Sequence, residues 1–370
     1  MIGVIVWVLG GVLVAAAAGG WTYRAVLRRR TAKALDIRTP NGIAEAGFVR
    51  IGGIGQWIQI RGEDRRNPVL LVLHGGPGMS YLGITPLFRS WERHFTVVQW
   101  DQRGAGRTYG HAGKAKKDPI TLDRIVEDGI EVAEHLCRRL RQERIILIGH
   151  SAGSMVGLGL IRRRPDLFHA YVGTGQVADM VRNDTLSYER LLERVRAAGN
   201  TRAVRALEAM GPPPYRNART WIAKQRWIMR TDQEIRAFQR MALPMTLSEP
   251  GYSLRDFFHQ NAGLISTITR TYDEIMSYRA DRWGGTFHVP VVILQGETDE
   301  QALTSLAEEQ FATITAPHKA WVTLTGHGHL AMLVAPDRFL DELLARVRPL
   351  ARGPQGQPGE LGAAAVEEEV

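Results

Sequence analysis

The stretch that most constrains the fold of this chain is IILIGHSAGS, residues 145–154. Its apolar half, Ile145–Ile148, predicts a buried strand, and the small residues that follow cannot continue that strand. Ser151 then lies between two glycines, in the pattern Gly-x-Ser-x-Gly. In this pattern a strand turns sharply into a helix, and the small neighbours leave room beside an exposed serine hydroxyl. The stretch therefore predicts an α/β fold with Ser151 as a nucleophile.

Several other short apolar runs predict strands of the same sheet. Apolar strands that alternate with helices form a mostly parallel sheet with helices on both faces. A predicted hairpin within residues 47–60 precedes them. The predicted strands lie in Val69–Leu73 and within residues 95–108, 145–148, 170–175, 289–299 and 319–329, and the predicted helices lie near residues 84–93, 121–141 and 152–164.

Composition divides the chain into segments. Residues 179–285 are helical in pattern, rich in arginine and interrupted by GPPPY, which predicts a helical lid inserted over the carboxyl edge of the sheet. The last residues are rich in glycine and proline and then acidic, which predicts disorder. The predicted boundaries are 1–30 for a transmembrane anchor and its basic flank, 31–46 for a linker, 47–178 and 286–350 for the two parts of the core, 179–285 for the lid, and 351–370 for the disordered tail.

The amino-terminal residues 2–23 carry no charge, and a helix of this length spans about 30 Å, the thickness of a bilayer core. Trp21 and Tyr23 lie where interfacial aromatic residues are expected, and four arginines follow within 24–30. Because the positive charge comes after the apolar run, we predict a single-pass protein of the cell membrane with its catalytic domain in the cytoplasm. The alternative is a signal peptide cleaved near Ala15–Ala18 and a secreted product.

A catalytic serine needs a base, and the base needs a carboxylate that orients it. Asp299 follows the predicted strand VVILQ in the loop GETD, and His329 follows the predicted strand AWVTL in TGHGH. Both lie just past the carboxyl ends of parallel strands, at the edge of the sheet where active sites form. We predict the catalytic triad Ser151, Asp299 and His329, in the chain order that this motif uses. His327 is the alternative base, and Glu297 is the alternative acid.

Negative charge that develops on a substrate carbonyl oxygen needs N–H donors, which form an oxyanion hole. One donor is predicted to be the backbone N–H of Ala152, directly after the nucleophile. The other is predicted in the loop HGGPG, residues 74–78, where glycines let the backbone approach the oxyanion. Gly76 is the first choice for this donor and Gly75 the second.

The composition sets limits on partners and cofactors. The formal net charge is +9, but the arginines are spread along the chain without a recognition motif, so we expect no nucleic-acid partner. The single cysteine, Cys137, excludes an intrachain disulfide and a two-thiol metal site. No dinucleotide fingerprint follows a predicted strand. We therefore expect neither a cofactor nor a bound metal.

Five motifs occur along the chain in the order of a known family. Together they resemble the proline iminopeptidase group of the α/β-hydrolases, and the resemblance covers most of residues 47–345. It implies an α/β-hydrolase fold and serine hydrolysis, with Ser151 as nucleophile, Asp299 as acid and His329 as base. Pro336, seven residues after His329, is also typical of the group. The motifs are HGGPG at 74–78, DQRGAGRT at 101–108, GHSAG at 149–153, GETD at 296–299 and GHGH at 326–329.

The lid departs from that group. Members that cleave amino-terminal proline hold the substrate ammonium with lid carboxylates, one of them usually in a Trp-Glu pair. The matching region here, residues 219–230, contains no such pair and carries lysine and arginine, which oppose a cationic substrate if they face the pocket. Glu249 and Asp256, in a turn with aromatic residues, are the candidates for substrate binding. Ala152 also stands where the group often carries tryptophan.

The predicted function is a membrane-anchored serine hydrolase that forms an acyl-enzyme on an ester or amide bond, including an amino-terminal peptide bond. Its expected partners are a small-molecule or short peptide substrate and the membrane. Proline iminopeptidase activity proper is the alternative. A catalytically inactive binding or scaffold protein on the same fold is a third reading, against which the complete predicted triad argues. We expect acyl esters to be cleaved at least as well as prolyl amides.

Overall fold

The computed structural model describes residues 2–113 and 118–351, with side chains described from residue 18 onward. The predicted disordered tail lies, from residue 352, outside this part of the chain. In the described residues, eight strands form one sheet in the order β1-β2-β4-β3-β5-β6-β7-β8. The strands are β1 (Ile43–Ile51), β2 (Ile54–Gly62), β3 (Val69–Leu73), β4 (Thr96–Asp101), β5 (Ile145–His150), β6 (Phe168–Thr174), β7 (Val291–Gly296) and β8 (Lys319–Leu324).

The sheet is mostly parallel, as the alternation of strands and helices predicts. Strands β3 to β8 run parallel to their neighbours, whereas β1 and β2 form an antiparallel hairpin at one edge, and β2 pairs antiparallel with β4. Central strands of such a sheet are buried on both faces, which is why β3 and β5 read as continuous apolar runs.

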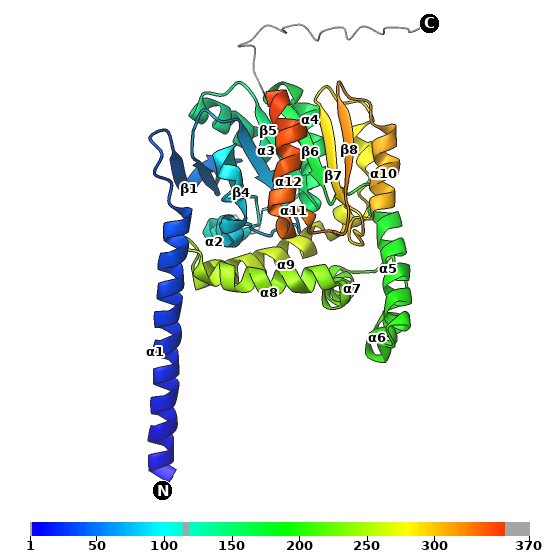
Figure 1. Cartoon of the computed structure of the whole chain (residues 1–370). Helices are drawn as coiled ribbons and strands as arrows, with labels where there is room; N and C mark the ends of the chain where they lie inside the picture. Colours follow the sequence, from blue (N-terminus) through cyan, green and yellow to red (C-terminus); the bar gives the residue numbers. More distant parts are fainter. Residues whose placement is uncertain (1, 114–117, 352–370) are drawn as a thin grey trace, which may run out of the picture.

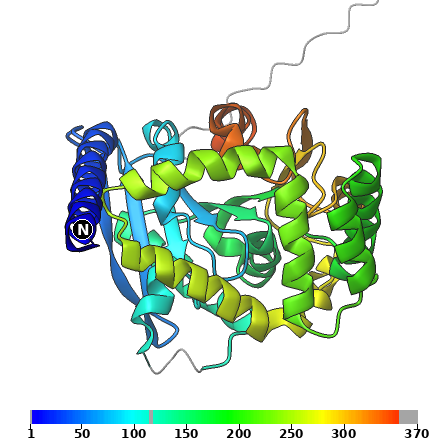
Figure 2. The same ribbon diagram turned by 90° about the horizontal axis from the view of Figure 1, so that it is seen from below.

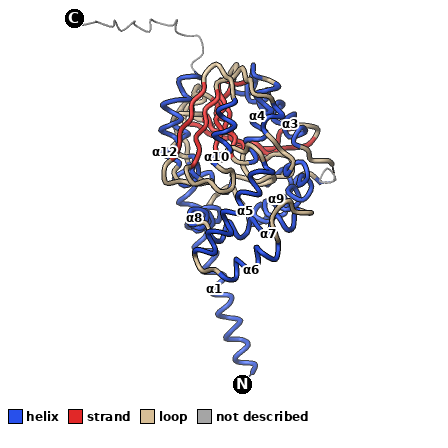
Figure 3. The backbone as a smooth tube through the Cα atoms, turned by 90° about the vertical axis from the view of Figure 1, so that its right-hand side faces the viewer, coloured by secondary structure: helices blue, strands red, loops and turns tan. Residues whose placement is uncertain are grey.

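Helices cover both faces of the sheet (Figure 3). Leu71 of β3 points into one apolar core with α3 (Leu122–Leu140) and α4 (Ala152–Arg163), while Leu70 points into a second core with α12 (Pro336–Glu342). Alternate residues of each strand therefore belong to different cores, as the two-residue repeat of a strand requires. Shorter elements are α2 (Gly106–His111), α10 (Thr304–Thr313) and α11 (Ala331–Val334), a π-helix at Leu343–Val347, and 3-10 helices at Pro165–Leu167, Ala280–Trp283 and Arg348–Ala351.

The helix predicted near residues 84–93 forms two 3-10 helices instead, Leu82–Phe88 and Trp91–Arg93. Pro86 lies inside the first of them, and Ile84 departs from helical backbone angles. Proline disfavours the α-helical conformation at the residue before it, which disfavours a regular α-helix through Thr85.

A group of helices lies across the carboxyl ends of the parallel strands (Figures 1 and 2). These helices separate β6 from β7 in the chain, which is the region predicted as a lid. They bury small apolar clusters of their own, one around Leu191 and Leu207 and another around Tyr215 and Tyr272. The lid helices are α5 (Met180–Ala197), α6 (Thr201–Met210), α7 (Ala218–Thr231), α8 (Gln233–Ser248) and α9 (Leu254–Met276).

Helix α1 (Ile2–Leu35) projects from the rest of the molecule on the side of the lid (Figure 1). Its carboxyl end is held by two arginines of the core. Arg61 donates to the carbonyl of Leu35, and Arg89 donates to that of Ala34 at 3.2 Å. These bonds satisfy carbonyls that a helix end leaves without a partner.

Helix α1 contains the predicted membrane segment, residues 2–23, most of whose side chains precede the described ones. Among the helices whose side chains are described, none combines the length and apolar character that crossing a bilayer requires. The predicted linker, residues 31–46, is occupied by the end of α1 and the start of β1, with Asp36–Gly42 between them.

Candidate active site

Ser151 lies at the turn between β5 and α4, with φ at +55° and ψ at −124°. A residue other than glycine seldom adopts positive φ, so the surrounding structure holds this turn in a strained conformation. The glycines of the motif allow the turn to pack. A Cβ at Gly153 would lie 2.5 Å from the carbonyl oxygen of Leu73, and one at Gly149 would lie 2.8 Å from that of Gly153. Because Ser151 directly follows β5, it lies at the carboxyl edge of the sheet, which the lid helices cover (Figure 1).

The structure brings Ser151, His329 and Asp299 into one hydrogen-bonded line. The Nε2 atom of His329 lies 2.9 Å from the Oγ atom of Ser151, and its Nδ1 atom lies 2.8 Å from a carboxylate oxygen of Asp299. Asp299 and His329 are both buried. In this arrangement, a proton on Nδ1 leaves Nε2 free to accept the proton of the serine hydroxyl.

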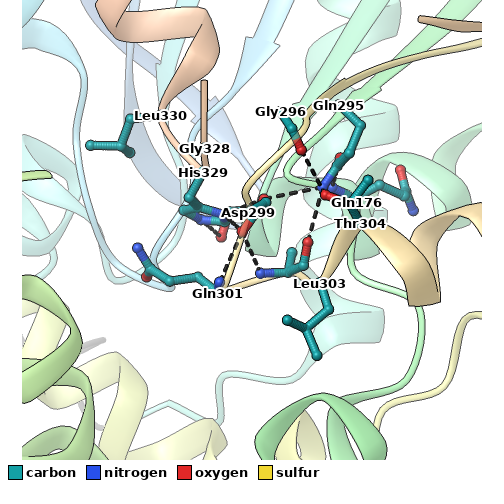
Figure 4. A network of polar contacts seen from close by, with 12 residues as sticks. Gln176, Gln295, Gly296, Asp299, Gln301, Leu303, Thr304, Gly328, His329 and Leu330 are labelled. Atoms are coloured by element: carbon teal, nitrogen blue, oxygen red, sulfur yellow. Dashed lines mark hydrogen bonds and ion pairs between the residues drawn. The ribbon is translucent and has the colours of Figure 1, made fainter. Parts of the chain in front are cut away.

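The carboxylate of Asp299 is held by several donors besides His329 (Figure 4). The backbone N–H groups of Gln301 and Ala302 both donate to Oδ1 at 2.8 Å. The side-chain amide of Gln295 donates to Oδ2 at 3.1 Å. These three donors fix the position and direction of the carboxylate. This loop therefore presents His329 with an oriented acceptor.

The electrostatic surroundings of His329 favour its protonated form. Burial by itself lowers the pKa of an imidazole, but the negative charge and hydrogen bond of Asp299 outweigh it here. The pKa of His329 is therefore raised above its ordinary value. A raised pKa makes His329 a stronger acceptor for the serine proton and stabilises the imidazolium that forms.

A lid residue that sequence reasoning missed also holds the histidine loop. The carboxylate of Glu234, on α8, accepts from the backbone N–H of Gly328 at 2.8 Å and from that of Leu330 at 3.0 Å. These two groups flank His329, so Glu234 clamps the loop on both sides of it. The sequence marks Glu234 only as one of many lid acids, and nothing in its immediate neighbourhood distinguishes it.

The two alternative residues lie elsewhere. The imidazole of His327 faces Glu234, with 3.5 Å between Nδ1 and a carboxylate oxygen. The carboxylate of Glu297 accepts from the backbone N–H of Gly326 at 2.9 Å. The structure thus brings His329 and Asp299, rather than His327 and Glu297, to Ser151.

His150, directly before the nucleophile, connects two loops of the site. Its Nε2 atom lies 2.9 Å from the carbonyl oxygen of His329, and its Nδ1 atom meets the hydroxyl of Tyr81. The same hydroxyl accepts from the backbone N–H of Gly75 at 3.1 Å. Burial, with the neighbouring His329, lowers the pKa of His150 to about 3. The ring is therefore neutral, donating to His329 and accepting from Tyr81.

The residues predicted to form the oxyanion hole lie at the same place. Gly75 lies against the nucleophile, because a Cβ there would be 2.9 Å from the Cβ atom of Ser151. Its N–H already donates to Tyr81. Gly76 has a φ of +47°, and among the hydrogen bonds of the described residues none uses the N–H of Gly76 or of Ala152. This pattern favours Gly76 and Ala152 as the donors open to a substrate.

The two predicted substrate-binding acids have partners within the lid or its edge. Asp256 pairs with Arg107 at 2.9 Å and closes a capping box with Ser253 at the start of α9. Burial opposes its ionisation, but these hydrogen bonds outweigh it and lower its pKa. Glu249 ends α8, and burial raises its pKa. No contact between described residues joins either carboxylate to Ser151 or His329.

Another lid acid, Glu274, lines a pocket that also includes Ala152, the residue after the nucleophile. This small pocket beside Ala152 is lined by apolar residues of α3, α4 and α9, by Glu274, and by the polar residues His74, Gln102, Arg103 and Thr271. The carboxylate of Glu274 accepts from the backbone N–H of Leu122 at 2.8 Å. Glu274 is therefore a lid carboxylate that shares a pocket with Ala152.

The lid cations do not crowd this pocket. Lys224 is fully buried and pairs with Asp184 inside the lid. Arg226 and Arg230 are exposed, and Arg230 lies over the ring of Trp227. These cations therefore give no reason to exclude a cationic substrate. Among the described residues, no three His, Cys, Asp or Glu side chains gather as metal ligands would.

The chain is similar to several known hydrolases. The family model described as "Alpha/beta hydrolase family" matches residues 69–342. The probable aminopeptidase YbaC of Bacillus subtilis is 26% identical over 302 residues, which is 80% of this chain and 94% of that protein. The proline iminopeptidase of Thermoplasma volcanium is 31% identical over 114 residues, or 31% of this chain and 36% of that protein.

Solved structures share the fold at lower identity. A proline iminopeptidase-related protein from Thermus thermophilus has a TM-score of 0.58 and 22% identity, over 83% of this chain and 99% of that chain. A membrane phospholipase A described as a bacterial virulence factor has a TM-score of 0.59 and 14% identity, over 94% of this chain and 99% of that chain. At these identities the likeness concerns the fold alone.

Proposed function

Because the chain belongs to the alpha/beta hydrolase family and is a hydrolase, we propose that it cleaves an ester or amide bond through a covalent acyl-enzyme on Ser151. The observation that carries this proposal is the hydrogen-bonded line of Ser151, His329 and Asp299 at a strained turn. A serine with no hydrolytic role has no need of a buried imidazole and carboxylate aligned behind it.

In the proposed mechanism, His329 accepts the hydroxyl proton as the Oγ atom of Ser151 attacks the substrate carbonyl. The oxyanion that forms accepts hydrogen bonds from the N–H groups of Gly76 and Ala152. The imidazolium then gives its proton to the leaving alcohol or amine, which departs and leaves the acyl-enzyme. Water, deprotonated by His329, attacks the acyl carbonyl and releases the acid. Asp299 accepts the hydrogen bond from Nδ1 of His329 and keeps the imidazole in the required tautomer.

A fluorophosphonate probe tests this proposal, because it reacts with activated serines. We expect stoichiometric labelling of the full chain at Ser151, and no labelling of the variant Ser151→Ala. Hydrolysis of p-nitrophenyl acetate should be lost together with labelling. A protein that folds normally but reacts with neither compound would refute the proposed activity and support the inactive-scaffold reading.

A second candidate is an aminopeptidase, of which proline iminopeptidase is one form. The pocket beside Ala152 favours it, because Glu274 offers a carboxylate for a substrate ammonium. Identity to the probable aminopeptidase YbaC supports the same reading. A panel that compares prolyl amide, its acetylated form and short acyl esters separates the two candidates. We expect esters to be cleaved at least as well as prolyl amide, whereas an aminopeptidase would lose activity on acetylation and on Glu274→Gln.

We also propose that α1 anchors the enzyme in the cell membrane, with the catalytic domain in the cytoplasm. The support is the uncharged segment of residues 2–23 followed by arginines, within a helix about 50 Å long. The full chain should fractionate with membranes, and a reporter fused after Val370 should behave as cytoplasmic. Cleavage of the catalytic domain by protease added outside intact cells would contradict this orientation, and release of a secreted domain would support the signal peptide instead.

A further inference from the structure

We propose that the outer face of the lid rests on the membrane and that the substrate is an acyl ester of a lipid in that membrane. The inference rests on the proposed function and extends it to a substrate class. We define the docking face as the exposed apolar residues of α8 and α9: Met241, Leu243, Leu254, Phe257, Phe258 and Ile265.

The docking face is unusually apolar for a helix surface in contact with water. Phe258 is 69% exposed, Ile265 53% and Leu243 51%. Leu254, Phe258 and Ile265 are spaced by four and seven residues, so they form one stripe along α9. Exposed apolar groups gathered on one face mark a surface that contacts another apolar phase.

Helix α1 indicates which apolar phase this is. Arg24 donates to the carbonyl of Leu247 at the end of α8 at 3.1 Å, and Arg28 donates to that of Pro250. The uncharged residues 2–23 begin directly beyond this contact and extend about 30 Å, which matches a bilayer core. A bilayer spanned by residues 2–23 would therefore end at the level of the turn between α8 and α9.

Both lid and anchor point to the same side of the molecule. Figure 2 looks from the side toward which α1 projects, and α8 and α9 lie in front of the sheet in this view. On α1, the exposed Trp21 and Tyr23 occupy the position of interfacial aromatic residues next to the lid contact. The anchor and the α8–α9 turn are thus in contact on the side of the molecule toward which α1 projects.

Charges around the docking face suit a lipid surface. The exposed Arg236 and Arg240 lie on α8, one turn apart, and the exposed Arg255 lies at the start of α9 beside Leu254. An apolar patch bordered by arginines is typical of helices that lie in the membrane interface, where anionic headgroups meet the cations. A hydrophobic partner protein would not need this positive border.

The docking face lies one helix away from the loop of residues 74–78, which contains the predicted oxyanion donor Gly76. A Cβ at Gly76 would be 3.5 Å from the Leu264 side chain, and one at Gly78 would be 2.7 Å from the carbonyl oxygen of Gly263. Ile265 and Phe258 of the same helix are exposed. The predicted oxyanion donor Gly76 therefore contacts one side of α9, and exposed residues of the docking face lie on the same helix. An acyl group that comes from the bilayer has to pass only the width of this one helix to reach the site.

The experiment uses the full chain reconstituted in vesicles that contain anionic lipid and a fluorogenic long-chain acyl ester. The variant Leu243→Ser/Phe258→Ser/Ile265→Ser should hydrolyse the vesicle-borne ester about tenfold more slowly than the parent, because it loses apolar contact with the bilayer. Hydrolysis of soluble p-nitrophenyl acetate should change by less than about twofold. Val181→Ser is the matched control, since Val181 is an exposed apolar residue of α5 outside the docking face. Equal rates for parent and triple variant on the vesicle-borne ester would overturn the proposal.

A second measurement does not depend on catalysis. In a Cys137→Ala background, an environment-sensitive fluorophore on Phe258→Cys should be quenched by quencher-bearing lipids, whereas one on Val181→Cys should not. Failure of quenching at 258 overturns the docking proposal even if the enzyme hydrolyses soluble esters. Fluorescence that instead depends on protein concentration in detergent would show that a second copy covers this face and would also overturn it. Quenching without any serine reactivity would retain docking and refute the proposed hydrolase function.

Discussion

The two sides of the active site are held in place by different means. On the sheet side, Ser151 and Asp299 follow the buried strands β5 and β7, and each is fixed by neighbouring backbone or by donors within its own loop. On the lid side, helices α8 and α9 pack small clusters inward and leave apolar and arginine side chains exposed. The sheet side therefore positions the predicted catalytic residues, and under the proposed function the lid side selects the substrates that reach them.

One lid residue contributes to the sheet side. Glu234 belongs to the lid, yet its carboxylate binds the backbone on both sides of His329. A comparison of variants on the two sides tests whether the division holds and whether Glu234 is its exception.

The largest effect is expected on the sheet side, at Ser151. Because triad residues act as a unit, Ser151→Ala should lower kcat by about 10⁶-fold. The measurement is steady-state hydrolysis of p-nitrophenyl acetate by the full chain, with circular dichroism as the control for folding. If the folded variant keeps more than a hundredth of the parent rate, a residue other than Ser151 is the nucleophile.

Asp299→Asn should lower kcat by about 10⁴-fold, because the amide does not hold His329 in the correct tautomer. The same change should alter the pH profile. Asp299 raises the pKa of His329, and the base must be neutral to accept a proton, so activity falls as pH drops through that pKa. Without the carboxylate the pKa of His329 falls, and the acid limb of the residual activity should move to lower pH. An unchanged limb would show that another group titrates there.

The strands and the elbow could be predicted from sequence because their signals are local. A buried strand such as Val69–Leu73 is a continuous apolar run, and residues just past strand ends meet at one edge of the sheet. Asp299 and His329 could be selected in this way without knowledge of the packing. The local signal fails for the lid. Several of its helices carry acidic residues, and the sequence does not show which of these side chains points toward the active site.

The lid acids illustrate this limit. Asp256 lies beside aromatic residues in the sequence, but in the structure its carboxylate forms an ion pair with Arg107 and caps the start of α9. Glu234 has no such neighbours, and only the packing of α8 on the histidine loop gives it two backbone partners. Glu274 likewise reaches the pocket beside Ala152 because α9 crosses the carboxyl edge of the sheet.

Glu234→Gln should lower kcat for the soluble ester by about tenfold, and Glu234→Ala by more. Glutamine keeps one acceptor oxygen for Gly328 or Leu330 but replaces the other with a donor, so the loop loses one of its two hydrogen bonds. Removal of the negative charge also lowers the pKa of His329, which shifts the acid limb to lower pH. Exposed Glu208, in α6, is the control for a lid carboxylate away from the site. Equal activity of Glu234→Gln and the parent at all pH values would show that no lid residue contributes to the positioning of His329.

The smallest effect is expected at His327, two residues from the catalytic base. Its side chain is partly exposed and faces Glu234, and its contact with the acid loop runs through its backbone carbonyl, which accepts from the N–H of Thr298 at 3.0 Å. Because His327→Ala keeps that carbonyl, kcat should change by less than about threefold. The paired variant His329→Ala should lose several orders of magnitude under the same assay. A severe loss with His327→Ala and a mild loss with His329→Ala would reverse the assignment of the base.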